Sequence, residues 1–247
     1  NFRPALGFVQ RTDMIGTGAM VGFTPRVGDG DGLIRQWRFF GYARDVRNHA
    51  DIKETGVLSL GVDAIFESRD RVGIKIAQNK ENLTAGFTLG NGVKIQEGNY
   101  RDQKISFSVR TNQSRGVWGN LALSKGDYFG GDKTSMLGSI GKQFSNHLTL
   151  YGSANQNIVS MPNQGEFTAD VYGLTAEVAL NRKWFGKASV QYDNFSEQLQ
   201  IYCRINWIHT PGSDLFIVIN QQYDMSGSDR ELIVGNRVIK LTYLFQI

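Results

Sequence analysis

Apolar side chains recur at every second position along most of the chain, and the final stretch shows this pattern most clearly. Its apolar positions are Ile239, Leu241, Tyr243, Phe245 and Ile247, and the residues between them are mixed and partly polar. Because successive side chains of a β-strand point to opposite faces, this alternation predicts a strand with one wholly apolar face. Helical periodicity is hard to find elsewhere, so the pattern predicts an all-β protein.

The same alternation predicts about fourteen strands in the chain. We expect them near residues 5–10, 15–23, 36–44, 58–67, 72–77, 104–110, 117–124, 136–144, 148–153, 165–181, 184–192, 199–207, 215–219 and 237–247. Within residues 165–181 the apolar positions change from odd to even numbers, from Phe167 to Leu174. Gly173 lies in this region, and it predicts a β-bulge there.

The connections between the predicted strands alternate in length. Short ones lie near residues 68–71, 113–116, 145–147, 181–183 and 210–213, and long ones near 44–55, 79–101, 125–133, 155–166, 193–198 and 223–236. In an antiparallel meander every second connection lies at the same end, so one end should carry tight turns and the other long loops, as in bacterial outer-membrane barrels. Residues 79–101 are numerous enough to fold into a lumen or contact a partner; the alternative is a mobile surface loop.

Several aromatic residues lie on the apolar face near the tight-turn end. They are Phe66, Phe144, Trp184, Trp207, Tyr243 and Phe245. A membrane barrel carries a girdle of aromatic side chains at this level, where lipid meets water. The alternative is that aromatic residues simply favour strands.

Two architectures produce such alternation. A soluble β-sandwich turns its apolar faces inward, whereas a membrane barrel turns its apolar face toward lipid. The alternating connections, the apolar carboxyl-terminal strand and an opposite face rich in Gly, Ser, Asn, Lys and Arg favour a barrel with a wet lumen. We therefore predict that residues 1–247 form an antiparallel transmembrane β-barrel domain. Because the chain begins at Asn1, without Met or a signal peptide, we expect a processed product or a part of a longer chain.

Composition excludes several other classes of protein. The chain has 247 residues, of which 40% are hydrophobic, and its mean hydropathy is -0.30. Its longest apolar run, at 215–219, is far shorter than the roughly 18–20 residues of a membrane-spanning helix. The single Cys203 allows no internal disulfide, and we expect no metal or cofactor. The net charge of +4 includes no basic cluster with interleaved aromatic residues, so no nucleic-acid partner is expected.

Charged residues on the face opposite the apolar one are the candidates to line a lumen. They are Arg38, Asp63, Lys75, Lys104, Arg110, Lys187 and Arg204. Six of these seven are cationic, so a conducting barrel should mildly prefer anionic or polar solutes. The alternative is that these charges pair with one another, or with a plug, and only stabilise the wall.

Two loops carry residues that enzymes or metal sites use. His49 is close in sequence to Asp45, Asp51 and Glu54, a set that could support general base catalysis or bind a cation. We prefer a solvated loop, in which Arg44, Arg47 and Lys53 balance these carboxylates. His147 and His209 fall at tight turns. Residues 27–32 resemble a calcium loop, but an EF-hand needs Glu where this chain has Phe40, so we predict a flexible turn.

Three internal stretches and the end of the chain carry a family resemblance. They are Pro4-Ala5-Leu6-Gly7-Phe8-Val9-Gln10-Arg11-Thr12-Asp13, Ser189-Val190-Gln191-Tyr192-Asp193, residues 204–218 and Lys240-Leu241-Thr242-Tyr243-Leu244-Phe245. With these stretches the chain resembles a C-terminal outer-membrane β-barrel domain of unknown function from Gram-negative bacteria, which follows a module like the family-9 carbohydrate-binding modules. The resemblance implies further strands before Asn1, so that the last strand pairs with a strand outside this chain. It implies no catalytic residues.

Three functions follow as hypotheses. The first is a non-enzymatic outer-membrane barrel that acts as a channel, a membrane anchor or a subunit of an outer-membrane complex, in saccharide handling or transport. Its partners would be outer-membrane lipid, other outer-membrane or periplasmic subunits, and a carbohydrate-binding module on the same parent chain. The second is an outer-membrane hydrolase with a site around His49. The third is a soluble carbohydrate-binding β-protein.

Overall fold

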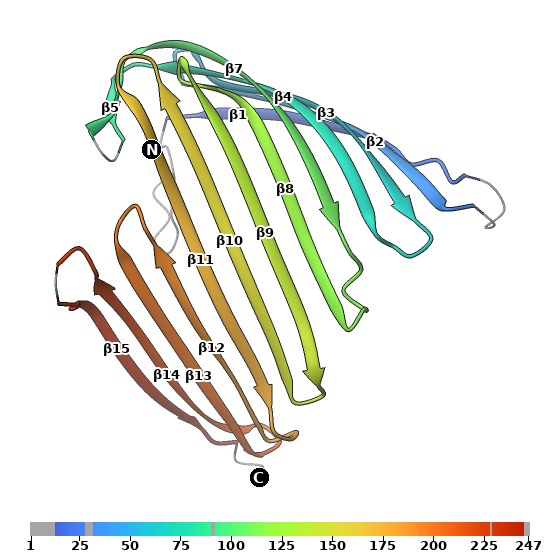
Figure 1. The fold of residues 1–247 in the computed structure, drawn as a ribbon, viewed down its shortest axis with the longest axis vertical. Coiled ribbons are helices and arrows are strands. Elements are labelled where there is room, and N and C mark those ends of the chain that lie inside the picture. Colours follow the sequence, from blue (N-terminus) through green and yellow to red (C-terminus); the bar gives the residue numbers. More distant parts are fainter. Residues whose placement is uncertain (1–12, 28–31, 90–91, 228, 245–247) are drawn as a thin grey trace. The chain divides into compact units, whose positions relative to one another are not determined.

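The computed structural model describes residues 13–27, 32–89, 92–227 and 229–244, and these fold as β-strands joined by turns (Figure 1). The strands are β1 (Ile15–Phe23), β2 (Ile34–Arg47), β3 (Lys53–Phe66), β4 (Arg71–Leu83), β5 (Phe87–Thr88), β6 (Lys94–Ile95), β7 (Gly98–Arg110), β8 (Val117–Tyr128), β9 (Gly131–Ser145), β10 (Leu148–Met161), β11 (Gly165–Ala179), β12 (Trp184–Asp193), β13 (Gln198–Thr210), β14 (Ser213–Asp224) and β15 (Glu231–Thr242). No helix in the described part of the chain is long and apolar enough to cross a membrane.

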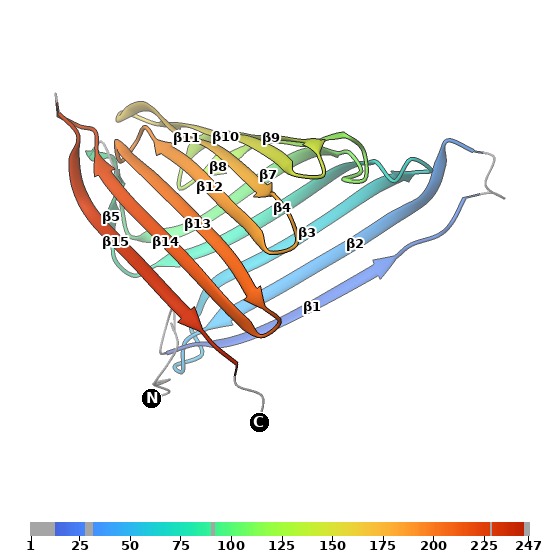
Figure 2. The ribbon, with the colours of Figure 1, turned by 90° about the horizontal axis from the view of Figure 1, so that it is seen from below.

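Thirteen of these strands form one sheet, in which neighbours follow the order of the chain (Figures 1 and 2). β5 and β6 form a separate two-stranded ribbon. Among the described residues, β1 and β15 are the two ends of the strand order. The all-β prediction is confirmed, and each strand of the large sheet overlaps a predicted strand. The predicted strand at residues 5–10 lies outside the described residues.

By its internal contacts the chain divides into two compact units. Unit 1 takes its described residues from 1–109, 122–134 and 158–167, and unit 2 from 110–121, 135–157 and 168–247. Unit 1 contains the antiparallel run β1 to β4, in which Ala19 lies opposite Ala43 and Leu60 opposite Ile76. Unit 2 contains the antiparallel run β12 to β15, in which Trp184 lies opposite Trp207 and Ile217 opposite Ile239.

The predicted long loops are shorter than expected, with one exception. β8 and β9 are joined by a two-residue turn at Phe129 and Gly130, whose positive φ angles of 48° and 84° suit a tight hairpin. β10 and β11 are joined by residues 162–164 alone, and of the predicted long loops only the one between β4 and β7, at residues 84–97, exceeds six residues. The prediction was wrong because the apolar alternation stops before the strand does. Backbone pairing needs no apolar side chain, so the strands continue with polar residues.

The prediction of a β-bulge at Gly173 is also wrong for the pairing of β11 with β12. The register between β11 and β12 runs without a shift from Val171 to Ala179. Phe167 instead packs against the buried cluster described next, so it belongs to the face opposite Leu174. The strand register shifts elsewhere, for example between Ile208 and Thr210 of β13.

Few apolar side chains are buried in the described part of the chain. They are Val46, Ala64, Val93, Ile95, Val159 and Met161. The last four form one cluster in unit 1, where the ribbon β5–β6 meets β10. Most large apolar side chains are instead exposed, so the sheet is not organised around a central apolar core.

Candidate functional site

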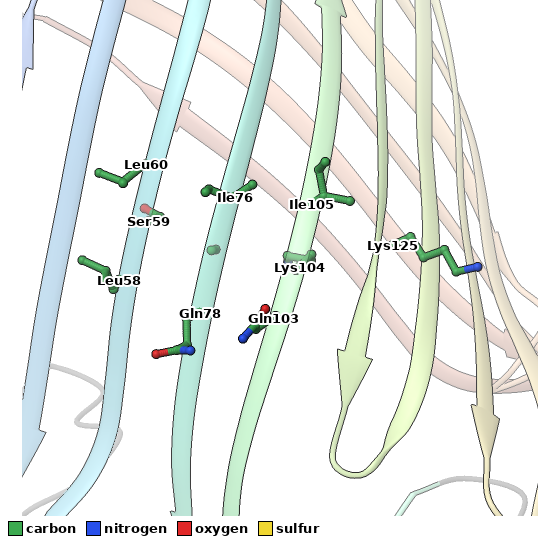
Figure 3. A pocket seen from close by; sticks show the side chains of 10 residues that line it. Leu58, Ser59, Leu60, Ile76, Gln78, Gln103, Lys104, Ile105 and Lys125 are labelled. Carbon is green, nitrogen blue, oxygen red and sulfur yellow. The ribbon is translucent and has the colours of Figure 1, made fainter.

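One face of the sheet in unit 1 is apolar and exposed. Leu60 and Ile76 lie opposite each other on β3 and β4, and 54% and 53% of their surfaces are exposed. Figure 3 shows Leu58, Leu60, Ile76 and Ile105 in front of their strands, with Ser59 behind. Gln78 and Gln103 share the front side, below Leu60 in this view. This face of β4 and β7 therefore also carries polar side chains.

In unit 2, an apolar stretch on one face of the strands lies between aromatic residues at both ends. Trp184 of β12 stacks on Trp207 of β13, with ring centroids 5.4 Å apart. At the other end of β12, Tyr192 lies opposite Tyr172 of β11. Between Trp184 and Tyr192 this face carries Gly186, Ala188 and Val190, none of them polar. The nine residues from Trp184 to Tyr192 match the roughly 9–11 residues of a membrane-spanning strand.

The other predicted interfacial aromatic residues lie at the expected ends of their strands. Phe66 ends β3, Phe144 is 54% exposed near the end of β9, and Tyr243 is 57% exposed just beyond β15. The ammonium group of Lys142 lies 4.7 Å from the ring centroid of Phe144. Phe245 lies outside the described residues.

Sequence reasoning missed an aromatic group in unit 1, near the connection between β1 and β2. Phe23 of β1 stacks against Phe39 of β2 at 6.4 Å, and Trp37 stacks on Phe39 at the same distance. All three occupy the apolar face, because Phe23 lies opposite Phe39 in the register. Their position beside the β1–β2 connection was the signal that could have found them.

The opposite face carries the predicted lumen residues, and part of its charge is paired. Arg38 of β2 lies opposite Asp63 of β3 and donates from Nε to its carboxylate at 2.8 Å. The guanidinium of Arg38 also lies 4.8 Å from the Phe40 ring. Asp63 is only 5% exposed, so a fixed cation beside it offsets the cost of burying its charge.

A second set of contacts occupies the polar face of unit 2. Lys187 lies opposite Glu177, with 3.3 Å between Nζ and Oε1. Arg204 donates from Nε to Asn206 Oδ1 at 2.8 Å, and its guanidinium lies 5.2 Å from the ring of Phe216. Of the predicted set, Arg38 and Asp63 pair with one another, whereas Lys187 and Arg204 contact residues outside the set.

The remaining predicted cations are placed differently. Within the described residues, Lys75, Lys104 and Arg110 have no carboxylate within ion-pair distance. Lys75 lies opposite Gly61, which adds no side chain beside it. The polar face of unit 1 thus combines a partly buried ion pair with the unpaired Lys75 and Lys104, whereas Arg110 belongs to unit 2.

His49 contacts a residue that the sequence did not single out. Its backbone N–H donates to Asp13 Oδ1 at 2.9 Å, and its ring Nδ1 contacts the same oxygen. The backbone hydrogen bond from His49 lowers the pKa of the Asp13 carboxyl below its ordinary value. Because Asp13 precedes β1 and His49 follows β2, only the antiparallel pairing of these strands brings them together.

Two of the three carboxylates near His49 in sequence are held by cations. Asp45 contacts Arg47 and Lys53, and Asp51 contacts Arg47 at 3.2 Å. Glu54 accepts a hydrogen bond from Asn48 at 3.4 Å. These contacts describe the charge-balanced loop that we preferred to a catalytic site, with Arg47 and Lys53 in the expected role.

The other candidates for chemistry are dispersed. His147 Nδ1 contacts the backbone oxygen of Ala179 at 2.5 Å, and the His209 ring packs edge-on against Trp207 at 5.3 Å. Residues 28–31 of the predicted turn lie outside the described part. Among the residues that are described, no three His, Cys, Asp or Glu side chains are grouped so that they could hold a metal ion.

Comparisons with protein-family models, with curated proteins and with solved structures each found no match to this chain. The resemblance to an outer-membrane domain therefore stays a prediction. The geometry itself supplies two surfaces of opposite character on one sheet: an exposed apolar face with aromatic borders, and a face of polar and charged side chains.

Proposed function

We propose that this chain forms wall strands of a transmembrane β-barrel in a bacterial outer membrane and acts as a non-enzymatic channel. The apolar face contacts lipid, and the polar face lines a wet lumen. The observation that carries the proposal is that apolar side chains are exposed on neighbouring strands within each unit, among them Leu60 and Ile76 in unit 1 and Val190 and Ile239 in unit 2. Soluble monomers rarely expose contiguous apolar patches beyond roughly 300–600 Å², because such patches associate in water.

The borders of this face support the same proposal. Trp and Tyr side chains favour the membrane interface because one end of the ring is apolar and the other can meet water. In unit 2 the Trp184–Trp207 pair and the Tyr172–Tyr192 pair lie at opposite ends of an apolar stretch. Barrel strands in membranes show this arrangement, with an apolar band of about 25 Å between two aromatic girdles.

The polar face supports a channel more than a filled barrel interior. Lys75, Lys104 and Arg110 lack a carboxylate partner in the described residues, and unpaired cations require water. A saccharide as the transported solute, and a carbohydrate-binding module on the same parent chain, rest on the family resemblance alone.

The proposed orientation in the membrane can be tested by measuring whether lipid or water reaches successive positions along β3 and β4. Single cysteines at Leu58, Leu60, Ile74 and Ile76, and at the neighbouring positions Ser59, Lys75 and Ala77, are introduced with Cys203→Ser and carry a polarity-sensitive dye. The full natural chain is then reconstituted in vesicles. We expect lipids brominated in their acyl chains to quench the even positions, and aqueous iodide to quench the odd ones.

The two sets of positions serve as matched controls because they alternate on the same two strands. Quenching by iodide at every position, with none by brominated lipid, would show a water-soluble sheet and end the proposal. Migration that does not depend on heating in detergent would point the same way, because folded membrane barrels resist detergent until heated.

A further inference from the structure

The connection between β4 and β7 is folded rather than extended into solvent. Phe87 pairs with Ile95 and Thr88 with Lys94, which forms the ribbon β5–β6. The N–H of Leu89 donates to the backbone oxygen of Val93 at 2.7 Å. Two strands of two residues cannot be stable by themselves, so the ribbon depends on what it packs against.

The ribbon supplies half of the most buried apolar cluster in the described residues. Val93 and Ile95 are 5% and 2% exposed, and they pack with Val159 and Met161 of β10, at 3% and 6%. Gly131 makes this packing possible, because a Cβ at this position would lie 2.6 Å from the sulfur of Met161.

Polar contacts also hold the ribbon in place. The Gln164 side chain binds both backbone groups of Lys94: it accepts from N at 2.7 Å and donates to O at 3.1 Å. The Phe129 ring, in the β8–β9 turn, packs edge-on against Phe87 and Tyr100, with centroids 5.6 and 5.2 Å away. The ribbon is therefore attached across the ends of several strands.

The ribbon packs against the polar face of unit 1. Its cluster contacts Tyr128, which lies on the face opposite the exposed Leu123 because the two are five residues apart on β8. The ammonium group of Lys133 lies 5.1 Å from the Tyr128 ring centroid.

Lys104, one of the cations without a carboxylate partner, lies beside Gly126 of β8, two residues before Tyr128: a Cβ built on Gly126 would lie 2.6 Å from the Lys104 Cα. Asp102 precedes Lys104 by two residues, and its carboxylate accepts the N–H of Phe129 at 3.2 Å. Two cations are thus placed beside the ribbon.

We propose that the ribbon β5–β6 narrows the mouth of the lumen, and that Lys104 and Lys133 beside it make this passage selective for small anions. The proposal rests on the proposed channel and names its solute class. An ammonium group near a narrow, partly dehydrated passage attracts anions and repels cations more strongly than it would in open water.

Single-channel conductance of the full natural chain in planar bilayers tests the narrowing. Ile95→Asp places a charge in the buried cluster and should release the ribbon, which raises conductance about twofold or more. Thr88→Asn changes an exposed side chain of the same ribbon without adding a charge and should leave conductance unchanged. Gln164→Ala, which removes two hydrogen bonds but buries no charge, should raise conductance by a smaller factor.

The reversal potential in a KCl gradient tests the selectivity. Lys104→Gln and Lys133→Gln should each lower the anion-to-cation permeability ratio severalfold. Lys125→Gln is the matched control, because Lys125 points away from Lys104 (Figure 3) and should not change the ratio. Heat-modifiable migration shows that each variant has folded.

The outcomes separate this inference from the proposed function. A barrel that inserts and conducts, but in which Ile95→Asp and Gln164→Ala behave like Thr88→Asn, would overturn the ribbon's role while the channel stands. Selectivity that is unchanged in both lysine variants would overturn the role of these cations. A chain that does not insert into membranes would contradict both the proposed channel and this inference.

Discussion

At the scale of single residues, close packing on the polar face explains why Gly73 has no side chain. Gly73 lies opposite Asp63 in the register of β3 and β4. A Cβ on Gly73 would overlap Asp63 Oδ1 and would lie 3.2 Å from Ser108 Oγ. Asp63 cannot move aside without weakening its contact with Arg38, so the glycine and the ion pair depend on each other.

We therefore predict that Gly73→Ala destabilises the folded chain by about 1–3 kcal/mol, the usual cost of overpacking. Gly138→Ala is the matched control, because no atom lies within 4 Å of a Cβ built at that position. Urea unfolding of the barrel in lipid vesicles, followed by tryptophan fluorescence, measures both variants. Equal unfolding midpoints for the two variants would contradict the prediction, because they would show that the Asp63 side chain makes room for the added methyl group without cost.

At the scale of the strand, we expect the two faces of β12 to meet different solvents, lipid on one side and water on the other. Ala188 lies midway between Trp184 and Tyr192 on the apolar face and opposite Cys203 of β13. Gln191 lies on the other face, opposite Gln200. In a soluble sheet, an introduced charge should cost the same at an exposed position in the middle of a strand as at an exposed position near its end.

In a membrane, the cost of a charge depends on depth. We predict that Ala188→Arg destabilises the barrel by about 2–4 kcal/mol and Tyr192→Arg by about 0–1 kcal/mol, apart from the loss of the tyrosine ring. Gln191→Arg should cost little because it faces the lumen. Equilibrium unfolding in vesicles gives all three values, and equal costs at Ala188 and Gln191 would contradict a lipid-facing surface.

At the scale of the whole sheet, the two end strands require an explanation. β1 and β15 each pair with a single neighbour in the strand order, and every residue of both is exposed. Unpaired strand edges promote association, and membrane barrels have none because they close. In an antiparallel meander of thirteen strands, the first and last run in the same direction, so direct closure would create a parallel pair.

Bacterial single-chain barrels have even numbers of strands, so we predict that at least one further strand lies between β1 and β15 in the complete barrel. A short thiol cross-linker should join cysteines at Ala19 and Ala43, which lie opposite each other, in a Cys203→Ser background. Cysteines at Ala19 or Val21 should not join to Val238 or Ile239. Efficient cross-linking of β1 to β15 would show direct closure and contradict the prediction.

The sequence by itself determined the strands and the faces of their side chains. Alternation is a local property of each strand, so Leu58, Leu60 and Ile76 could be assigned to one face without any knowledge of their neighbours. The same reasoning assigned Arg38 and Asp63 to the opposite face. It did not locate the strand ends beyond the apolar band, because backbone pairing continues through polar residues such as those leading to Tyr128 and Gly131.

Only the tertiary structure decided which side chains meet across strands. The Arg38–Asp63 pair and the Trp184–Trp207 stack depend on strand register. The contact of Asp13 with His49 joins residues on either side of the β1–β2 hairpin, and the ribbon packs Ile95 against Met161, far along the chain. These contacts are set by the pairing of whole strands, which the period of a single strand does not contain.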